Sequence, residues 1–214
     1  MSHARDERLA LCRLFIKVGP DAPTECAGWT ARDLAAHLVV RERRPDAALG
    51  VLVPPMSGYG ERIRTQLRDG TPYARIVEMV AKGAPAWSPF ALPGVDSAAN
   101  LVEYFTHHED VRRAQPGWEP RELTPAFERT LWNRLAMARL TLRRAPAGVR
   151  LHWSAESRPG GPEQVVKRGA PMVTVSGGPA ELMLWTLGRT SVARVAFDGD
   201  TEAVERLRAA SWGI

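Results

Sequence analysis

Apolar side chains recur every three to four residues through the first two-thirds of the chain, which predicts a succession of amphipathic helices. The first of them carries Leu9, Cys12, Phe15 and Ile16 and should end at Gly19–Pro20, because glycine favours a helix C-terminus and proline cannot continue a helix. Further helices are predicted over 30–48, 60–69, 72–82 and 96–114. Loops rich in glycine and proline should separate them at 50–60 and 83–94.

Two of these helices have clear signals at their ends. Thr30 has a side chain preferred at an N-cap, and Asp33 would lie in the first turn of the helix that follows. Pro45 should kink that helix or end it before residue 48. Asp96 or Ser97 would cap the helix that runs to about Ala114.

A later apolar stripe predicts one long helix that faces a helical bundle. Its members are Phe127, Leu131, Leu135, Ala138 and Leu142, at positions i, i+4, i+8, i+11 and i+15. The stripe would complete a helical domain of residues 1–145.

The pattern changes after residue 146 from helical spacing to short runs typical of strands. Strands are predicted at 149–153, 165–166, 172–175 and 192–197, and helices at 179–187 and 201–210. The sequence therefore predicts a mostly α protein, with a four-helix bundle over 1–145 and a small α/β domain over 146–214.

Composition and charge narrow the classes of function. The 214 residues carry a formal charge of +5, but all except three of the 29 basic residues are arginines, spread along the chain and mixed with acidic residues. A nucleic-acid-binding element would concentrate them, so nucleic acid is not expected as a partner. The apolar stretches are far shorter than the ~20 residues of a membrane span, and residues 1–8 contain no apolar signal segment. We therefore expect a soluble cytoplasmic protein.

The two cysteines carry little information in the sequence. Cys12 lies within a helical pattern and Cys26 lies in a loop, without a CxxC motif. A disulfide framework and a cysteine-based metal site are therefore not expected. Cys12 is interpreted as a small buried residue and Cys26 as an incidental loop residue.

One predicted helix carries residues that suit a metal ion. Glu103 and His107 are four residues apart, so their side chains share one helical face. Asp110 lies on the same side and could either accept the second imidazole N–H of His107 or pair with an arginine. His108 should face away from Glu103.

A third ligand would have to come from another helix, and His37 is the best candidate. His3 lies near the chain terminus, and His152 lies on a predicted strand of the other domain. Two imidazoles and one carboxylate with an open position are typical of a catalytic zinc site, although nickel, iron or manganese would also fit. On spacing alone, a histidine on an apolar helix face is more often a buried structural residue than a metal ligand, and a Glu–His pair can be a solvated surface contact.

Two segments around these residues resemble a known family. Residues 28–38 (GWTARDLAAHL) and 103–114 (EYFTHHEDVRRA) are similar to the two signatures of the mycothiol-dependent maleylpyruvate isomerase family, an actinobacterial branch of the DinB-like metal-binding four-helix bundles. Residues 173–189 are similar to the family's small sterol-carrier-like α/β domain. The resemblance implies His37, Glu103 and His107 as metal ligands and a catalytic arginine in the C-terminal domain, but it does not fix the substrate.

Together, these features predict a metal- and thiol-dependent isomerase or transferase. A metal-bound thiolate, with mycothiol as the implied thiol, would attack a small electrophilic substrate. Arg189 could hold a substrate carboxylate, with Arg194 as its rival, although Arg189 could equally interact with the dipole of the preceding helix. The alternative is a non-catalytic metal- or ligand-binding bundle protein, for example one related to stress. Either protein would be a monomer or a homodimer.

Overall fold

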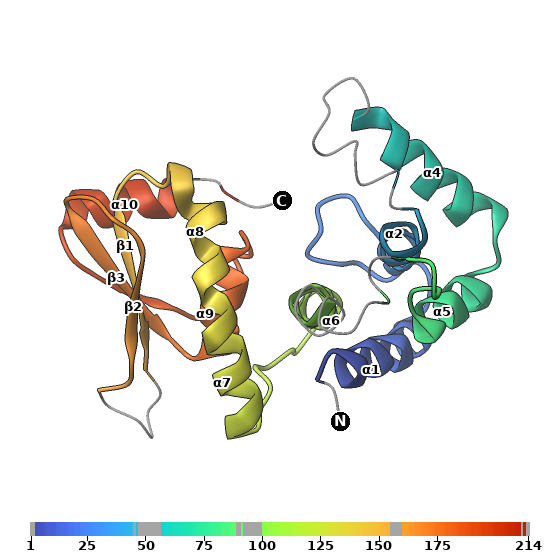
Figure 1. Ribbon diagram of the computed structural model, residues 1–214, viewed down its shortest axis with the longest axis horizontal. Coiled ribbons are helices and arrows are strands. Elements are labelled where there is room, and N and C mark those ends of the chain that lie inside the picture. Colours follow the sequence, from blue (N-terminus) through green and yellow to red (C-terminus); the bar gives the residue numbers. More distant parts are fainter. Residues whose placement is uncertain are drawn as a thin grey trace. The chain divides into compact units, whose positions relative to one another are not determined.

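The computed structural model describes residues 3–44, 46, 57–88, 91, 100–154, 160–210 and 212. The chain forms two compact units, Met1–Pro120 and Arg121–Ile214 (Figure 1). The first is helical and the second combines helices with a four-stranded sheet, so the predicted fold class is confirmed.

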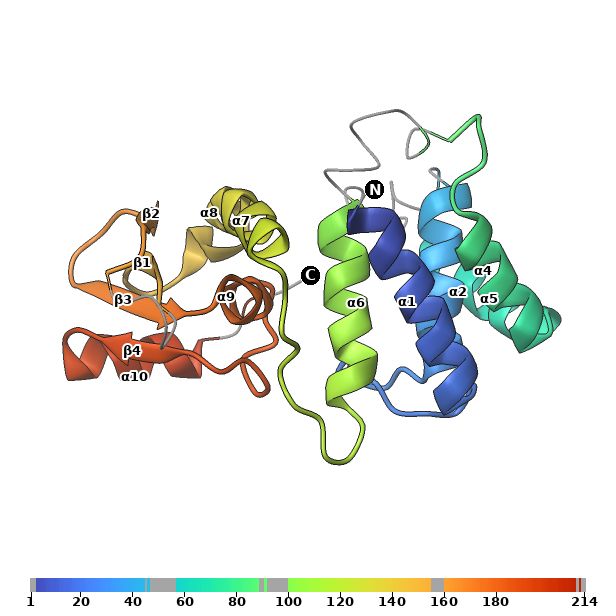
Figure 2. The same cartoon turned by 90° about the horizontal axis from the view of Figure 1, so that it is seen from below.

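Five helices make up the described part of the first unit. They are α1 (His3–Val18), α2 (Ala31–Arg43), α4 (Ser57–Gly70), α5 (Tyr73–Lys82) and α6 (Leu101–Arg113). Helix α1 packs against α6 and α5, and α2 packs against α5 and α4, so the helices lie side by side around one apolar core (Figure 2). Leu11, Phe15, Leu34 and Ile76 are fully buried in this core.

The ends of the helices follow the sequence signals. Helix α1 stops where Gly19 takes a φ of +86°, but Ile16 is 72% exposed and does not belong to the buried face that the spacing predicted. Thr30 caps α2 through a reciprocal arrangement with Asp33, as predicted, and the helix ends at Arg43, before Pro45. Helix α6 begins at Leu101, and the predicted caps Asp96 and Ser97 lie outside the described residues.

The second unit begins with α7 (Pro125–Arg134) and α8 (Ala138–Thr141), which are joined and followed by the 3₁₀ turns Leu135–Met137 and Leu142–Arg144. The predicted single long helix is thus interrupted. Four strands follow: β1 (Gly148–Trp153), β2 (Glu163–Lys167), β3 (Met172–Gly177) and β4 (Ala196–Asp198). Helix α9 (Pro179–Thr186) lies between β3 and β4 in the sequence, and α10 (Thr201–Ala209) follows β4.

The sheet is mixed, with the strand order β2-β1-β3-β4. Strands β1 and β3 are parallel, with Leu151 opposite Val175, and the outer strands run antiparallel to them. The predicted strand over 192–197 is shortened to Ala196–Asp198. The amides of Val192 and Ala193 turn back to the carbonyl of Arg189, so this stretch makes a turn instead of a ladder.

The apolar stripe of α7 and α8 packs against other elements of the second unit. Helix α7 packs on α9, and the turns that follow it pack near β2, which fully buries Leu131, Leu135 and Leu142. The sequence pattern predicted that this stripe belongs to the helical bundle. It also predicted a domain boundary between residues 145 and 146. The compact units instead divide between Pro120 and Arg121, because the stripe finds its apolar partners in the second unit.

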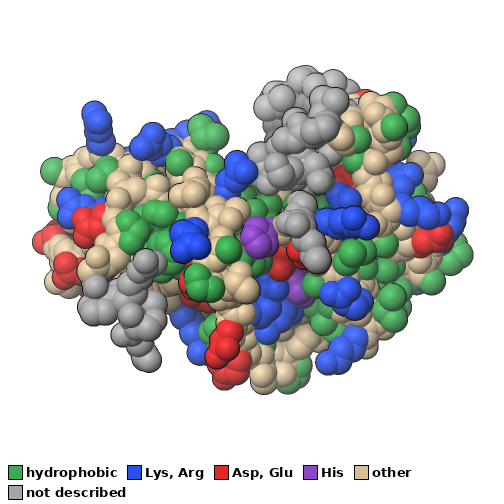
Figure 3. Space-filling model, turned by 60° about the horizontal axis from the view of Figure 1, so that its bottom comes forward, with side chains coloured by type: hydrophobic (Ala, Val, Ile, Leu, Met, Phe, Trp, Pro, Cys, Tyr) green, Lys and Arg blue, Asp and Glu red, His purple; other side chains and the backbone are tan. Residues whose placement is uncertain are grey.

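Within the described residues, no helix is both long enough and apolar enough to cross a membrane. On the face drawn in Figure 3, basic side chains are interspersed with acidic and apolar ones and do not form one continuous patch.

Candidate metal centre

Helices α2 and α6 bring the three predicted ligand residues together. The Nε2 atom of His37 lies 3.2 Å from Oε1 of Glu103, and Nε2 of His107 lies 3.2 Å from the same oxygen. One donor atom from each residue lies within 4.8 Å of the others, which is compact enough for a single metal ion. The capped N-terminus of α2 fixes the start of the helix that carries His37. On α6, the four-residue spacing places Glu103 one helical turn before His107.

The three side chains differ in their access to solvent. The His37 and Glu103 side chains are 32% and 24% exposed, whereas that of His107 is only 9% exposed. The His37 and Glu103 side of the group is therefore the side at which an external molecule could reach a bound ion. An accessible side of this kind suits a catalytic metal site better than a closed structural one.

A nearby guanidinium supports the carboxylate. Nε of Arg41 lies 3.3 Å from Oε1 of Glu103, and the Arg41 side chain also donates to Oδ1 of Asn100 at 2.6 Å. Burial alone would raise the pKa of Glu103, but hydrogen bonds from His107 and His37 lower it well below its usual value. Glu103 is therefore ionised at neutral pH, as a metal ligand must be.

The two histidines are in different electrostatic environments. Burial lowers the pKa of His37, which favours the neutral imidazole that can bind a metal. Burial would also lower the pKa of His107, but the hydrogen bonds to Asp110, Cys26 and Glu103 raise it well above its usual value. A metal ion at Nε2 of His107 would therefore compete with a proton at that atom.

A second group of potential ligands shares His107. The Cys26 thiol donates to Oδ2 of Asp110 at 3.2 Å, and its Sγ lies 3.9 Å from Nδ1 of His107. Cys26, His107 and Asp110 thus also have the spacing of a metal-binding group. The interpretation of Cys26 as an incidental residue is wrong. No spacing rule could have found it, because 81 residues separate it from His107 and only the fold joins them.

The hydrogen bond between His107 and Asp110 favours the first group. Nδ1 of His107 lies 2.8 Å from Oδ2 of Asp110, which is the distance of a charge-assisted hydrogen bond. With Nδ1 donating to this carboxylate, Nε2 is the ring nitrogen that faces Glu103 and His37, and a metal ion would bind it in place of its proton. Metal-binding histidines usually donate their second N–H to a carboxylate in this way. Asp110 therefore has the supporting geometry that its spacing predicted.

The neighbouring histidine lies on the other side of α6. Nδ1 of His108 is 2.9 Å from Oε2 of Glu7 on α1, so its ring contacts α1 and not the group around Glu103. This orientation is what the spacing of the two adjacent histidines predicted.

The predicted arginines of the C-terminal part make local contacts. The guanidinium of Arg189 donates to the carbonyl of Leu187 at 2.7 Å, in the turn where Gly188 has a φ of +86°. The backbone N–H of Arg194 donates to Oε2 of Glu181 at 2.8 Å. Both residues belong to the second compact unit, and a catalytic role for either stays a prediction.

The described residues of the helical unit therefore include two overlapping groups of side chains that could hold a metal ion, and both groups include His107. Comparison of the chain with protein-family models, with curated proteins and with solved structures finds no match.

Proposed function

We propose that this chain binds one divalent metal ion, with zinc as the best fit, through His37, Glu103 and His107. The observation that carries the proposal is the convergence of two imidazole nitrogens on one carboxylate oxygen, each at 3.2 Å, from two different helices. The donor set fits such an ion: two neutral nitrogen ligands and one anionic oxygen ligand leave a position open for a further molecule.

We further propose that the metal serves a thiol-dependent isomerase or transferase that acts on a small electrophilic substrate. When bound, the metal would supply a Lewis acid that lowers the pKa of a thiol at the open position. Asp110 would hold the proton at Nδ1 of His107, and Arg41 would keep the Glu103 carboxylate ionised and oriented. The sequence resemblance around His37 and Glu103 supports mycothiol as the thiol.

Metal analysis tests the binding site. We expect about one equivalent of metal in the purified wild-type protein and close to none in His37→Ala. His152→Ala is the matched control, because that histidine lies on β1 and contacts Ser176. Unchanged metal content in His37→Ala would contradict the proposed site.

A thiol titration tests the proposed chemistry. The Cys26→Ala variant is loaded with saturating cobalt, so that the thiol next to the proposed site cannot itself produce a thiolate-to-cobalt absorption band. We expect mycothiol to produce such a band. If millimolar mycothiol leaves the spectrum unchanged, the proposed metal-bound thiolate is contradicted and a non-catalytic metal-binding protein is favoured.

A further inference from the structure

We propose that the loop of residues 24–30 is the positioning element of the metal centre, because it contacts the surroundings of both histidine ligands. Its Cys26 acts on His107 through Asp110, and its Trp29 packs against His37. This inference rests on the proposed metal site and assigns a role to two residues that do not themselves bind the metal.

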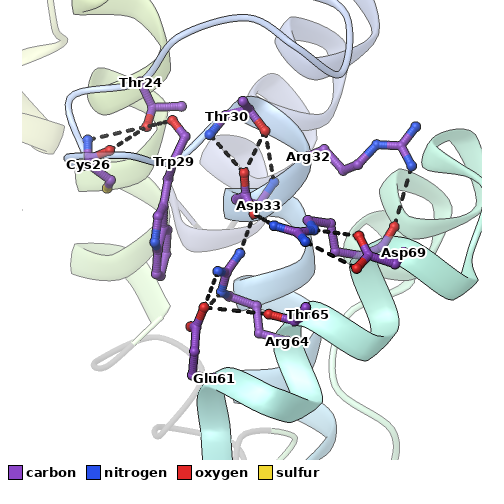
Figure 4. Close-up of polar contacts among 11 residues, drawn as sticks. Thr24, Cys26, Trp29, Thr30, Arg32, Asp33, Glu61, Arg64, Thr65 and Asp69 are labelled. Carbon is purple, nitrogen blue, oxygen red and sulfur yellow. Dashed lines mark hydrogen bonds and ion pairs between the residues drawn. The ribbon is translucent and has the colours of Figure 1, made fainter. Parts of the chain in front are cut away.

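Internal hydrogen bonds hold the loop in one conformation. The Thr24 hydroxyl donates to the carbonyl of Trp29 at 2.8 Å and accepts from the amide of Cys26 at 3.2 Å (Figure 4). The amide of Trp29 donates to the carbonyl of Cys26 at 2.9 Å. Gly28 has a φ of +76°, a region that glycine enters readily and that other residues rarely adopt. Cys26 and Trp29 therefore project from a fixed backbone.

One end of the loop is attached to α6 at the residue that orients His107. The amide of Glu25 donates to the carbonyl of Asp110 at 3.0 Å, and the Cys26 thiol donates to its carboxylate at 3.2 Å. The same carboxylate oxygen faces Nδ1 of His107 at 2.8 Å. Asp110 is only 1% exposed, so water can do little to replace the Cys26 thiol. Loss of that thiol would loosen the carboxylate that orients the His107 ring.

The other end of the loop contacts His37. The ring centroids of Trp29 and His37 are 5.1 Å apart, with an angle of 49° between the planes. The guanidinium of Arg64 lies 4.7 Å from the centroid of the Trp29 ring. Arg64 is itself held by Asp33 on α2 and Glu61 on α4, as Figure 4 shows. The indole is thus fixed by a buried cation and limits the rotation of the His37 ring.

A purely structural role for Trp29 and Cys26 makes a different prediction. Simple packing would lower stability when either side chain is removed, without changing the coordination of a bound ion. A positioning role would change the affinity and the ligand geometry, because residues that orient metal ligands typically contribute about 10–100-fold to metal affinity. The visible absorption spectrum of bound cobalt reports that geometry directly.

The experiment compares cobalt binding by the full chain and its variants. We expect about tenfold weaker binding and altered visible bands for Trp29→Leu and for Cys26→Ala. Trp29→Phe, which keeps an aromatic ring against His37, should restore most of the affinity. The matched controls are Trp87→Leu, at a residue that is 65% exposed, and Cys12→Ala, whose thiol faces the Val77 carbonyl. Both should bind cobalt like the wild type.

Three outcomes would overturn the inference, and each is distinct. If the wild type binds cobalt, and both Trp29→Leu and Cys26→Ala match the wild type in affinity and spectrum, the loop does not position the ligands. A thiolate-to-cobalt band that Cys26→Ala removes would show that Cys26 is itself a ligand. If the wild type binds no cobalt, the proposed function fails and this inference fails with it. Should Trp29→Leu not fold, Cys26→Ala still tests the inference through the affinity and spectrum of bound cobalt.

Discussion

The Nδ1 atom of His107 lies 2.8 Å from Oδ2 of Asp110, and both residues lie on α6, one turn apart. With this contact in place, Nε2 of His107 points toward Glu103 and His37. It thus separates the two groups of potential ligands that share His107, because Nδ1 donates to Asp110 and Nε2 is the nitrogen that a metal ion could bind in place of a proton.

Replacing Asp110 should therefore weaken metal binding without removing a ligand. We expect Asp110→Asn to bind zinc about 10–100-fold more weakly, because a neutral amide is a poorer acceptor for the Nδ1 proton. Competition with a chromophoric chelator measures the affinity. Asp198→Asn, at an exposed residue of β4, is the control. Equal affinities for Asp110→Asn and the wild type would show that Asp110 does not support His107.

Local rules account for part of the candidate ligand group that the sequence indicated, although the contact between His37 and Glu103 comes from the packing of two helices. The four-residue spacing of Glu103 and His107 fixes their common face, and Thr30 with Asp33 fixes the start of the helix that carries His37. The position of Cys26 could not be predicted, because loop geometry and the packing of α6 bring it to Asp110 from a distance in the sequence.

The stripe on α7 and α8 shows a similar limit. Its spacing revealed an apolar helix face, but periodicity does not say which element covers that face. Leu131 and Leu135 are buried in the second unit, although the sequence placed them in the bundle. Likewise, the β-type composition of residues 192–195 could not reveal that the amide of Arg194 pairs with Glu181 and not with a neighbouring strand.

The position of the stripe has a measurable consequence. Leu135 is fully buried, so Leu135→Ala should lower the free energy of unfolding of the second unit by about 2–5 kcal/mol. Cobalt affinity should stay at the wild-type value, because the proposed ligands lie in the first unit. Denaturant unfolding followed by tryptophan fluorescence, combined with cobalt titration of the native protein, checks both. Leu140→Ala, at a residue that is 71% exposed, should change neither quantity. A loss of cobalt affinity in folded Leu135→Ala would contradict the assignment of the stripe to the second unit.

Asp33 should make the first unit more stable at neutral pH than in acid. Burial would raise the pKa of Asp33, but hydrogen bonds from Thr30, Arg64 and Arg68 lower it well below its usual value. Because the unfolded chain holds this proton more tightly, the stabilisation is complete above about pH 4 and is lost as the pH falls further.

Asp33→Asn tests this dependence. The variant should be less stable than the wild type by about 1–3 kcal/mol at pH 7, because Arg64 and Arg68 lose a buried partner. The difference should narrow below about pH 4. Urea unfolding at several pH values measures it. Asp69→Asn, at an exposed residue that also pairs with Arg68, should change stability little at any pH. A difference that is constant with pH would show that the Asp33 charge is not the cause.

Gly83 lies against the buried ion pair of Arg8 and Glu42. Gly83 has a φ of +75°, and a Cβ atom there would collide with the Arg8 guanidinium, which lies 2.6 Å from Glu42 and 4.7 Å from the Tyr104 ring. Arg8 is held on two sides, so moving it would leave Glu42, which is 1% exposed, without its cation.

Gly117 provides the matched control, because its φ is +70° but nothing lies within 4 Å of the corresponding Cβ position. Gly117→Ala should cost only the backbone strain of about 1–2 kcal/mol. Gly83→Ala should cost about 1–3 kcal/mol more, because Glu42 would lose the hydrogen bond from Arg8 and keep, among the described residues, only the one from the Tyr104 hydroxyl. Urea unfolding of both variants measures the difference directly, because both glycines belong to the first unit. Equal losses in the two variants would show that Arg8 moves aside freely and that its pairing with Glu42 adds little to stability.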